Sequence, residues 1–327
     1  MHRKGSADLA GAFVVAGALI FAPTNAGAYC RTTTGGLRAN CTITPDDCCT
    51  VGKPLYWTNV CVGYSLQKDG TKQMSFDRAR TLIANAFQKW SGVSCPFLSD
   101  PSKTYPVSIG FRELPVVSCS EVGYNKTTNV KNQNVIVFRD QAWPHMDSAN
   151  VLGLTTVGFD PNTGELFDAD VEFNTAQRTL TANDPVPIDG YDFDSVVTHE
   201  LGHFIGLAHS ADQDATMFTS YNKGSTAMRS LAPDDLAAIC SVYLAPDSQP
   251  GAQNGRRATA DGGAVGAGPC DPEPRHGFST ECHEEVSSDD GCAIRPLPRR
   301  EPGKAGVALA LGVALAFGVA RRARPRA

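Results

Sequence analysis

Residues 199–209, His-Glu-Leu-Gly-His-Phe-Ile-Gly-Leu-Ala-His, constrain the fold of this chain more than any other stretch. His199 and His203 are four residues apart, so on an α-helix they lie on one face, one turn from each other. Each can offer an imidazole nitrogen to the same Zn²⁺ at about 2.0–2.1 Å. The spacing therefore predicts a helix that carries two ligands of one zinc ion.

The residues beside these two histidines have the chemistry of a catalytic metal centre. Glu200 is rotated by roughly 100° around the helix, which places its carboxylate beside the metal, where it can accept a proton from a bound water. Gly206 favours the left-handed conformation that ends helices, so the chain can turn and bring His209 back as a third ligand. Three histidines leave a fourth position open for water. A chance pattern on an amphipathic helix is the alternative, but the complete string is much more specific than its first five residues.

Charge and cysteine content limit the partners and the environment. The net charge of −5 and the scattered acidic residues give no concentrated basic face, so we expect no nucleic-acid partner. None of the eleven cysteines forms a Cys-x-x-Cys pair, and in an exported protein such cysteines form disulfides. Because eleven is odd, at least one thiol has another fate. The sequence alone leaves the connectivity open.

Both ends of the chain carry targeting patterns. Residues 1–28 have a basic start, an apolar run and the small residues Ala26-Gly27-Ala28, which together predict a signal peptide cleaved before Tyr29. Residues 301–327 contain a short apolar stretch followed by four arginines, which predicts a membrane segment with its arginines inside. A buried core helix is the alternative. We expect an exported protein at the cell surface or outside the cell.

Between these ends the sequence divides into three parts. Residues 29–53 predict a disulfide-stapled extension, with a propeptide whose cysteine blocks the zinc as the alternative. Residues 54–245 carry the periodic patterns of one domain, and residues 246–300 have the Pro, Gly and Ser content of a flexible linker. Within the domain we expect the following elements: strands near 55–66, 107–111, 135–138, 151–159 and 166–174, a helix capped by Ser75, the zinc helix capped by Asp194, and a last helix from Pro233 with Leu236, Ile239, Cys240 and Tyr243 on its buried stripe.

The stretch from about Pro54 to Ala245 resembles the metzincin metallopeptidases and, within them, the matrixins. The resemblance rests on the zinc motif followed by Ser210, on residues 86–91, on residues 168–174 and on Ala-Thr-Met-Phe at 215–218, which is similar to the family's Met-turn. It implies an α+β fold with a twisted, mostly parallel sheet, an active-site helix and a small C-terminal subdomain after the third histidine.

The same resemblance implies roles for two further residues. Met217 would pack beneath the three histidines, and Tyr221 would help to stabilise the transition state, with an exposed loop tyrosine as the alternative. Thr219 departs from the family pattern because it stands where matrixins usually have proline.

The resemblance also bears on the metals. Leu154 occupies a position where a ligand of the family's second zinc is expected, so we expect a single zinc. His145 is interpreted as a loop residue, with a metal ligand as the alternative. The acidic turn at 160–170 offers oxygen ligands for Ca²⁺, although a solvated turn would have the same composition.

The resemblance implies a zinc endopeptidase acting on proteins or peptides, with the substrate paired to an edge strand near 151–157. The alternatives are a surface-anchored binding or adhesion module that retains zinc structurally, and a zinc hydrolase acting on non-peptide amides. Gly291-Cys292, the apolar stretch and the arginines resemble myxobacterial C-terminal sorting signals. That likeness implies processing near Cys292 by export and sorting machinery.

Overall fold

The computed structural model describes residues 28–35, 48, 51–59, 61–97, 100–126, 131–146, 150–243 and 272–281, and the backbone of 292–296. All of them belong to one compact unit that ends at Pro296. The predicted signal peptide and the predicted membrane segment at 301–327 lie outside the described residues. Within the described ranges, no helix is both long enough and apolar enough to cross a bilayer.

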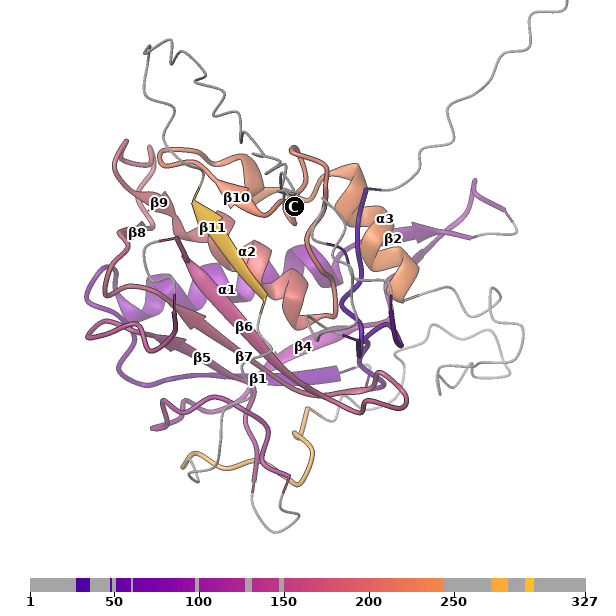
Figure 1. The fold of residues 1–327 in the computed structure, drawn as a ribbon, viewed down its shortest axis with the longest axis horizontal. Coiled ribbons are helices and arrows are strands. Elements are labelled where there is room, and N and C mark those ends of the chain that lie inside the picture. The colour runs from indigo at the N-terminus through magenta and orange to yellow at the C-terminus, as the bar shows by residue number, and fades with distance from the viewer. Residues whose placement is uncertain are drawn as a thin grey trace, which may run out of the picture. The chain divides into compact units, whose positions relative to one another are not determined.

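A twisted sheet of five main strands forms the base of the domain (Figure 1). Its order is β4-β1-β5-β7-β6, in which β6 alone runs antiparallel to its neighbour. The main strands are β1 (Cys61–Leu66), β4 (Gly110–Glu113), β5 (Val135–Phe138), β6 (Gly153–Phe159) and β7 (Leu166–Phe173). The mostly parallel sheet and the α+β class predicted from the sequence are therefore confirmed.

Six short strands lie outside this group. Two pairs form separate ribbons: β2 (Ser94–Pro96) with β3 (Thr104–Pro106), and β8 (Leu180–Thr181) with β9 (Tyr191–Asp192). The other two, β10 (Ser220–Tyr221) and β11 (Cys292–Pro296), continue the main sheet beyond β6 in the order β10-β11-β6.

Two long helices cover one face of the sheet. These are α1 (Phe76–Ser91) and α2 (Phe193–Phe204), which lie against each other in Figure 1. Phe87 of α1 stacks on Tyr64 of β1 at 4.1 Å between ring centroids and meets Phe204 of α2 edge-on at 5.3 Å. The indole of Trp90 donates to the carbonyl of Thr198 at 2.8 Å. The aromatic core thus fixes α2 between the sheet and α1.

The helix starts test the capping predictions. Ser75 caps α1 as predicted, since its hydroxyl accepts from the amide of Arg78. The prediction that Asp194 caps the zinc helix is wrong, because Asp192 accepts from the amide of Ser195 at 3.0 Å. Asp192 ends β9 with the extended backbone that a capping residue requires. Asp194 lies in the first turn instead and pairs with Lys89 at 2.6 Å.

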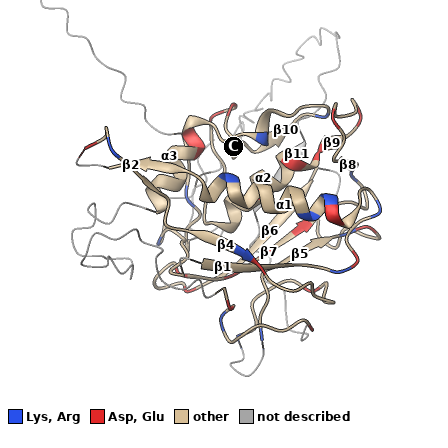
Figure 2. Cartoon of the chain, turned by 180° about the vertical axis from the view of Figure 1, so that it is seen from behind, with Lys and Arg blue, Asp and Glu red and all other residues tan. Residues whose placement is uncertain are grey.

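The last helix, α3 (Pro233–Val242), begins at the predicted proline but buries a different face. Leu236, expected in the buried stripe, is 38% exposed. The helix is turned so that the carboxylates of Asp234 and Asp235 face the protein, where they accept backbone amides. The first turn of α3 is coloured as acidic in Figure 2. A short 3₁₀ helix, η1 (Ala227–Arg229), precedes it.

Two strand predictions need correction at their ends. The strand expected over 55–66 begins at Cys61, because the amide of Tyr56 bonds to the carbonyl of Gly164 instead. The strand expected over 107–111 is found at Gly110–Glu113, since the amide of Val107 bonds to the carbonyl of Val93. The strands expected near 135–138, 151–159 and 166–174 are present.

One disulfide lies within the N-terminal extension, another lies within the domain, and a backbone bridge joins these two parts. Cys30 pairs with Cys48, and Cys95 of β2 pairs with Cys240 of α3. Arg31 forms a backbone bridge with Leu207, which follows the zinc helix. Cys61 and Cys119 are also disulfide-bonded. The predicted use of cysteines in disulfides is thus confirmed for these residues.

Part of the predicted linker is ordered. In the stretch 272–281, Phe278 bridges to Asn132 and the guanidinium of Arg275 lies over the ring of Phe167 at 4.0 Å. Residues 292–296 form β11 in the main sheet. These two stretches of the predicted linker therefore contact the domain, through partners that their local composition does not reveal.

Candidate active site

Helix α2 and the turn that follows it bring three histidines together. His199 and His203 lie one turn apart, with their Nε2 atoms separated by 3.1 Å. Gly206 then adopts a φ of +94°, and a Cβ there would approach the carbonyl oxygen of Leu55 to 2.6 Å. The turn returns His209, and one ligand atom from each of the three histidines lies within 4.8 Å of the others. The structure therefore unites the three predicted ligands.

Backbone carbonyls orient two of these imidazoles. Nδ1 of His199 donates to the carbonyl of Thr216 at 2.6 Å, and Nδ1 of His203 donates to the carbonyl of Leu207 at 2.9 Å. A carbonyl can only accept, so these bonds place the protons on Nδ1 and turn the Nε2 lone pairs inward. Burial, together with the neighbouring His203 and His209, holds the pKa of His199 well below its usual value.

This arrangement fits a zinc ion. Two neutral Nε2 lone pairs at 3.1 Å repel each other unless a cation lies between them. Nitrogens that are each 2.0–2.1 Å from a tetrahedral ion are about 3.4 Å apart, close to the observed spacing. Zinc also requires neutral imidazoles, as the lowered pKa of His199 provides. Over the part of the chain that the structure describes, no other set of three His, Cys, Asp or Glu side chains converges in this way.

Met217 packs against α2, and Thr216 of the same turn bonds to His199. Its side chain is 1% exposed and packs against Gly202, where a Cβ would collide with the methionine sulfur. Asp235 of α3 accepts the amides of Thr216 and Met217 at 2.7 and 3.0 Å, and Thr216 in turn accepts from His199. Burial raises the pKa of Asp235 despite these bonds. Sequence reasoning missed Asp235, because an aspartate in the first turn of a helix is commonplace.

Glu200 is fully buried and touches the edge strand β6. The hydroxyl of Thr155 donates to Oε2 of Glu200 at 2.7 Å. A Cβ on Gly153 would approach Oε1 to 2.7 Å, so the absence of a side chain there makes room for the carboxylate. Sequence reasoning also missed Thr155, since a threonine within a strand is ordinary.

Tyr221 lies in β10, four residues after Met217. Its side chain is buried, and its hydroxyl donates to the carbonyl of Ser225. Burial raises the pKa of Tyr221 to about 12. Tyr221 is therefore not an exposed loop residue, and it keeps its proton at neutral pH. Its role in the transition state stays a prediction.

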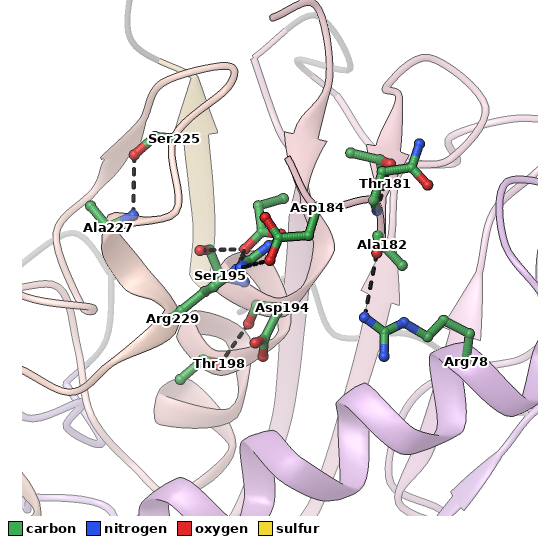
Figure 3. A network of polar contacts seen from close by, with 12 residues as sticks. Arg78, Thr181, Ala182, Asp184, Asp194, Ser195, Thr198, Ser225, Ala227 and Arg229 are labelled. Carbon is green, nitrogen blue, oxygen red and sulfur yellow. Dashed lines mark hydrogen bonds and ion pairs between the residues drawn. The ribbon is translucent and has the colours of Figure 1, made fainter. Parts of the chain in front are cut away.

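The N-terminal end of α2 is held by a second polar network. Arg229 of η1 donates to both carboxylate oxygens of Asp192 at 2.8 Å and reaches Asp184 at 3.4 Å. Figure 3 shows Arg229, Asp184 and Ser195 gathered at this end of the helix. Because Asp192 also caps the helix through Ser195, the network fixes the end of α2 opposite to the histidines.

A second buried cluster lies on β7, where Arg139 and His145 contact the carboxylate of Glu172. Glu172 pairs with Arg139 at 2.5 Å and with Nε2 of His145 at 2.6 Å. His145 was predicted to be a loop residue, and it lies outside the helices and strands. Burial raises the pKa of Asp170 to about 7, although its carboxylate accepts the amide of Val135 at 2.7 Å.

Asp168 and the turn before it complete the acidic region. Burial holds the pKa of Asp168 well above its usual value, and the adjacent Asp170 raises this pKa further. In the turn that connects β6 to β7, the carboxylate of Asp160 accepts the amide of Asn162 at 2.8 Å. The turn is thus held by its own hydrogen bonds.

Comparison with known proteins agrees with this geometry. The family model of the matrixins matches residues 56–244. Metalloendoproteinase 1 of Glycine max is 30% identical over 184 residues, which make up 53% of this chain and 51% of that protein. Matrix metalloproteinase-16 of Homo sapiens is 27% identical over 197 residues, which make up 59% of this chain and 28% of that protein. The chain spans about half or less of the length of these relatives.

Proposed function

Because the chain belongs to the matrixin family, we propose that it is a zinc-dependent endopeptidase that hydrolyses peptide bonds in extracellular proteins. The observation that carries the proposal is the convergence of His199, His203 and His209 beside a buried Glu200. A binding module with a structural zinc would have no need of this carboxylate, and nothing in the described residues favours a non-peptide amide as substrate.

Glu200 moves the proton in the proposed reaction. Zinc, when bound to the three histidines, supplies Lewis-acid polarisation of the scissile carbonyl and a more acidic water. Glu200 accepts the proton of the attacking water and then passes it to the leaving amine. Thr155 orients the carboxylate through its hydroxyl, and the space at Gly153 lets the carboxylate reach the edge of the sheet. Tyr221, protonated at neutral pH, would donate to the developing oxyanion after leaving Ser225.

The substrate would bind as an additional strand. β6 is the edge of the five-stranded sheet, and its residues 153 and 155 contact Glu200. An extended peptide paired with β6 would therefore pass directly over the general base, with affinity from main-chain hydrogen bonds.

The proposed setting is outside the cell. The pattern of residues 1–28 and the disulfides of the domain support export. The proposal includes an anchor or sorting role for 301–327 and processing near Cys292. Mass spectrometry of the mature protein tests both ends, and an intact Met1 or Ala327 would contradict these assignments. Calcium binding at the turn 160–170 stays a prediction that thermal melting with calcium and with a chelator would decide.

Glu200→Gln tests the central proposal. The substitution keeps the size of the side chain and removes its ability to accept the proton. We expect one zinc per chain in both proteins and casein cleavage only in the unmutated protein. Metal content by atomic absorption and cleavage by release of soluble peptides provide the two measurements. Zinc in both proteins with cleavage in neither would support the binding module instead.

A further inference from the structure

The backbone of β11 already occupies the edge of β6 where a peptide substrate is proposed to bind. The pairing is antiparallel, with Cys292 opposite Thr155, Ala293 opposite Leu154 and Ile294 opposite Gly153. Two of these three partners lie beside Glu200: the hydroxyl of Thr155 donates to its carboxylate, and a Cβ on Gly153 would approach Oε1 to 2.7 Å. Three residues of the C-terminal segment therefore run beside the general base.

The other edge of β11 is also paired. Arg295 lies opposite Ser220 and Pro296 opposite Tyr221, both in β10, which follows the Met-turn. Cα atoms of β11 lie within 8 Å of Cα atoms of α2, which carries the zinc motif. Figure 1 shows β11 between β6 and β10, in front of α2. The segment is thus bounded by the three elements that build the candidate site.

We propose that residues 292–296 act as an intramolecular inhibitor that occupies the peptide-binding edge of the candidate active site. This inference rests on the proposed peptidase function. One edge of β6 can pair with only one strand at a time, so a bound β11 excludes an extended substrate. The inhibitor belongs to the same chain, which gives it an effective concentration on the order of 1 mM. A peptide substrate at micromolar concentration competes poorly against such a tethered strand.

Proteolysis of the tail is the expected route to the active enzyme. Cleavage of the chain before Cys292 would release β11 from its tether, after which dilution would remove it from β6. Ten residues, 282–291, separate the segment from the preceding described stretch. A proteolytic event in this interval would therefore convert a latent enzyme into an open one without any change in the zinc site.

The test uses the full chain with the double substitution Ala293→Pro and Ile294→Pro. Successive amides of a strand point to opposite edges, so two adjacent prolines remove one donor toward β6 and one toward β10. The matched control is Ser287→Pro with Ser288→Pro, which places two prolines in the same tail before the paired segment. Metal content and thermal melting verify that both variants keep the folded domain.

We expect the Ala293→Pro/Ile294→Pro variant to cleave a short fluorogenic peptide with an apparent KM about tenfold lower, at unchanged kcat. This factor follows if the segment binds with a dissociation constant of ~0.1 mM at an effective concentration of ~1 mM. The control should keep the KM of the unmutated protein. A synthetic peptide with the sequence of residues 290–298 should inhibit the proline variant competitively, and a scrambled peptide should not. Equal KM values in all three proteins would overturn the inference.

Hydrogen exchange separates this inference from the proposed function. In the Glu200→Gln background, which should have no turnover, the amides of 153–155 should exchange faster in the proline variant than in the control. Faster exchange without peptidase activity in any protein would count against the proposed function alone. Unchanged exchange would overturn the occupancy of β6. Cleavage within 292–296 in the unmutated protein, absent in Glu200→Gln, would make the segment a substrate and also overturn the inhibitor role.

Discussion

The three-histidine cluster at the end of α2 and the carboxylate cluster on β7 are both buried, yet they differ in how far protein groups neutralise them. In the carboxylate cluster the protein supplies the cation, because Arg139 and His145 both contact Glu172. In the histidine cluster, backbone carbonyls bind the outer nitrogens of His199 and His203, and the inner nitrogens converge. Protein groups thus neutralise Glu172, whereas the three histidines fit an external cation.

The difference argues against a metal ion at Glu172. A metal site requires lone pairs that face one another and are not already neutralised. The carboxylate cluster offers oxygens, but its most buried acid, Glu172, is already paired on both oxygens. Clusters of acidic and histidine residues in a sequence therefore become informative about metals only when the positions of the neighbouring arginines are known.

Removal of one histidine from each cluster tests this difference most directly. His203→Ala removes a converging nitrogen, so we expect loss of bound zinc and a decrease in peptidase activity of at least about 10³-fold. His145→Ala should keep one zinc per chain and most of the activity. Metal analysis after dialysis and a peptide-cleavage assay give both readouts. Full zinc occupancy in His203→Ala would show that the ligand set is wrong.

Removal of the carboxylate of Glu172 tests how much its pairing with Arg139 and His145 stabilises the fold. Glu172→Gln leaves Arg139 and His145 beside an uncharged group, and breaking a buried pair in this way costs about 3 kcal/mol in the free energy of unfolding. Zinc content should not change. The matched control is Glu113→Gln, whose partner Arg80 is 53% exposed, so its loss should cost less than about 1 kcal/mol. Denaturant unfolding measures both values, and equal losses would refute the distinction.

The two aspartates of β7 give the cluster a pH dependence. The pKa of Asp170 is raised to about 7 and that of Asp168 is also raised, so their protonated forms favour the folded state. Their contribution is fully present below about pH 4 and is lost as pH rises through 7. Asp168→Asn keeps a donor toward Asp170 but cannot ionise. Between pH 6 and 9, we expect the unfolding free energy of the unmutated protein to fall by about 1–2 kcal/mol more than that of Asp168→Asn.

Denaturant titrations at several pH values check this expectation. Asp160→Asn, in the turn before β7, is the control and should follow the unmutated protein. Parallel pH profiles for Asp168→Asn and the unmutated protein would show that the pair does not share a proton. Repeating the series with calcium would reveal whether a cation replaces that proton.

The features predicted from the sequence are those that depend on local spacing. The histidines and Glu200 follow from helical periodicity, Gly206 from its backbone freedom, and Ser75 from capping chemistry. Local rules failed at α2, where Asp192 and Asp194 are both suitable caps and only the end of β9 decides between them.

Contacts between distant segments could not be predicted in this way. Thr155 is 45 residues from Glu200, and Asp235 is 19 residues from Thr216. Neither residue type is unusual where it occurs, so the contact becomes visible only once the sheet and α3 are in place. The pairing of β11 with β6 is the extreme case, because its partners there lie more than a hundred residues away and the surrounding composition predicts a linker.

Substitution of Thr155 has the smallest predicted effect, and it tests how Glu200 is held beside the three histidines. Thr155→Val removes the hydroxyl that donates to Glu200 while keeping the shape of the side chain. A hydrogen bond to a charged group contributes about 1.5 kcal/mol, so we expect kcat to fall about tenfold at nearly unchanged KM. Thr155→Ser should restore most of the rate, because serine keeps the donor.

Thr156→Val, on the opposite face of β6, is the control and should retain kcat. A fall in kcat that is equal for Val and Ser would mean that Thr155 acts through packing, and a change confined to KM would place it in substrate binding. Only a kcat effect rescued by serine fits a carboxylate of Glu200 that is oriented by the hydroxyl of an edge-strand residue.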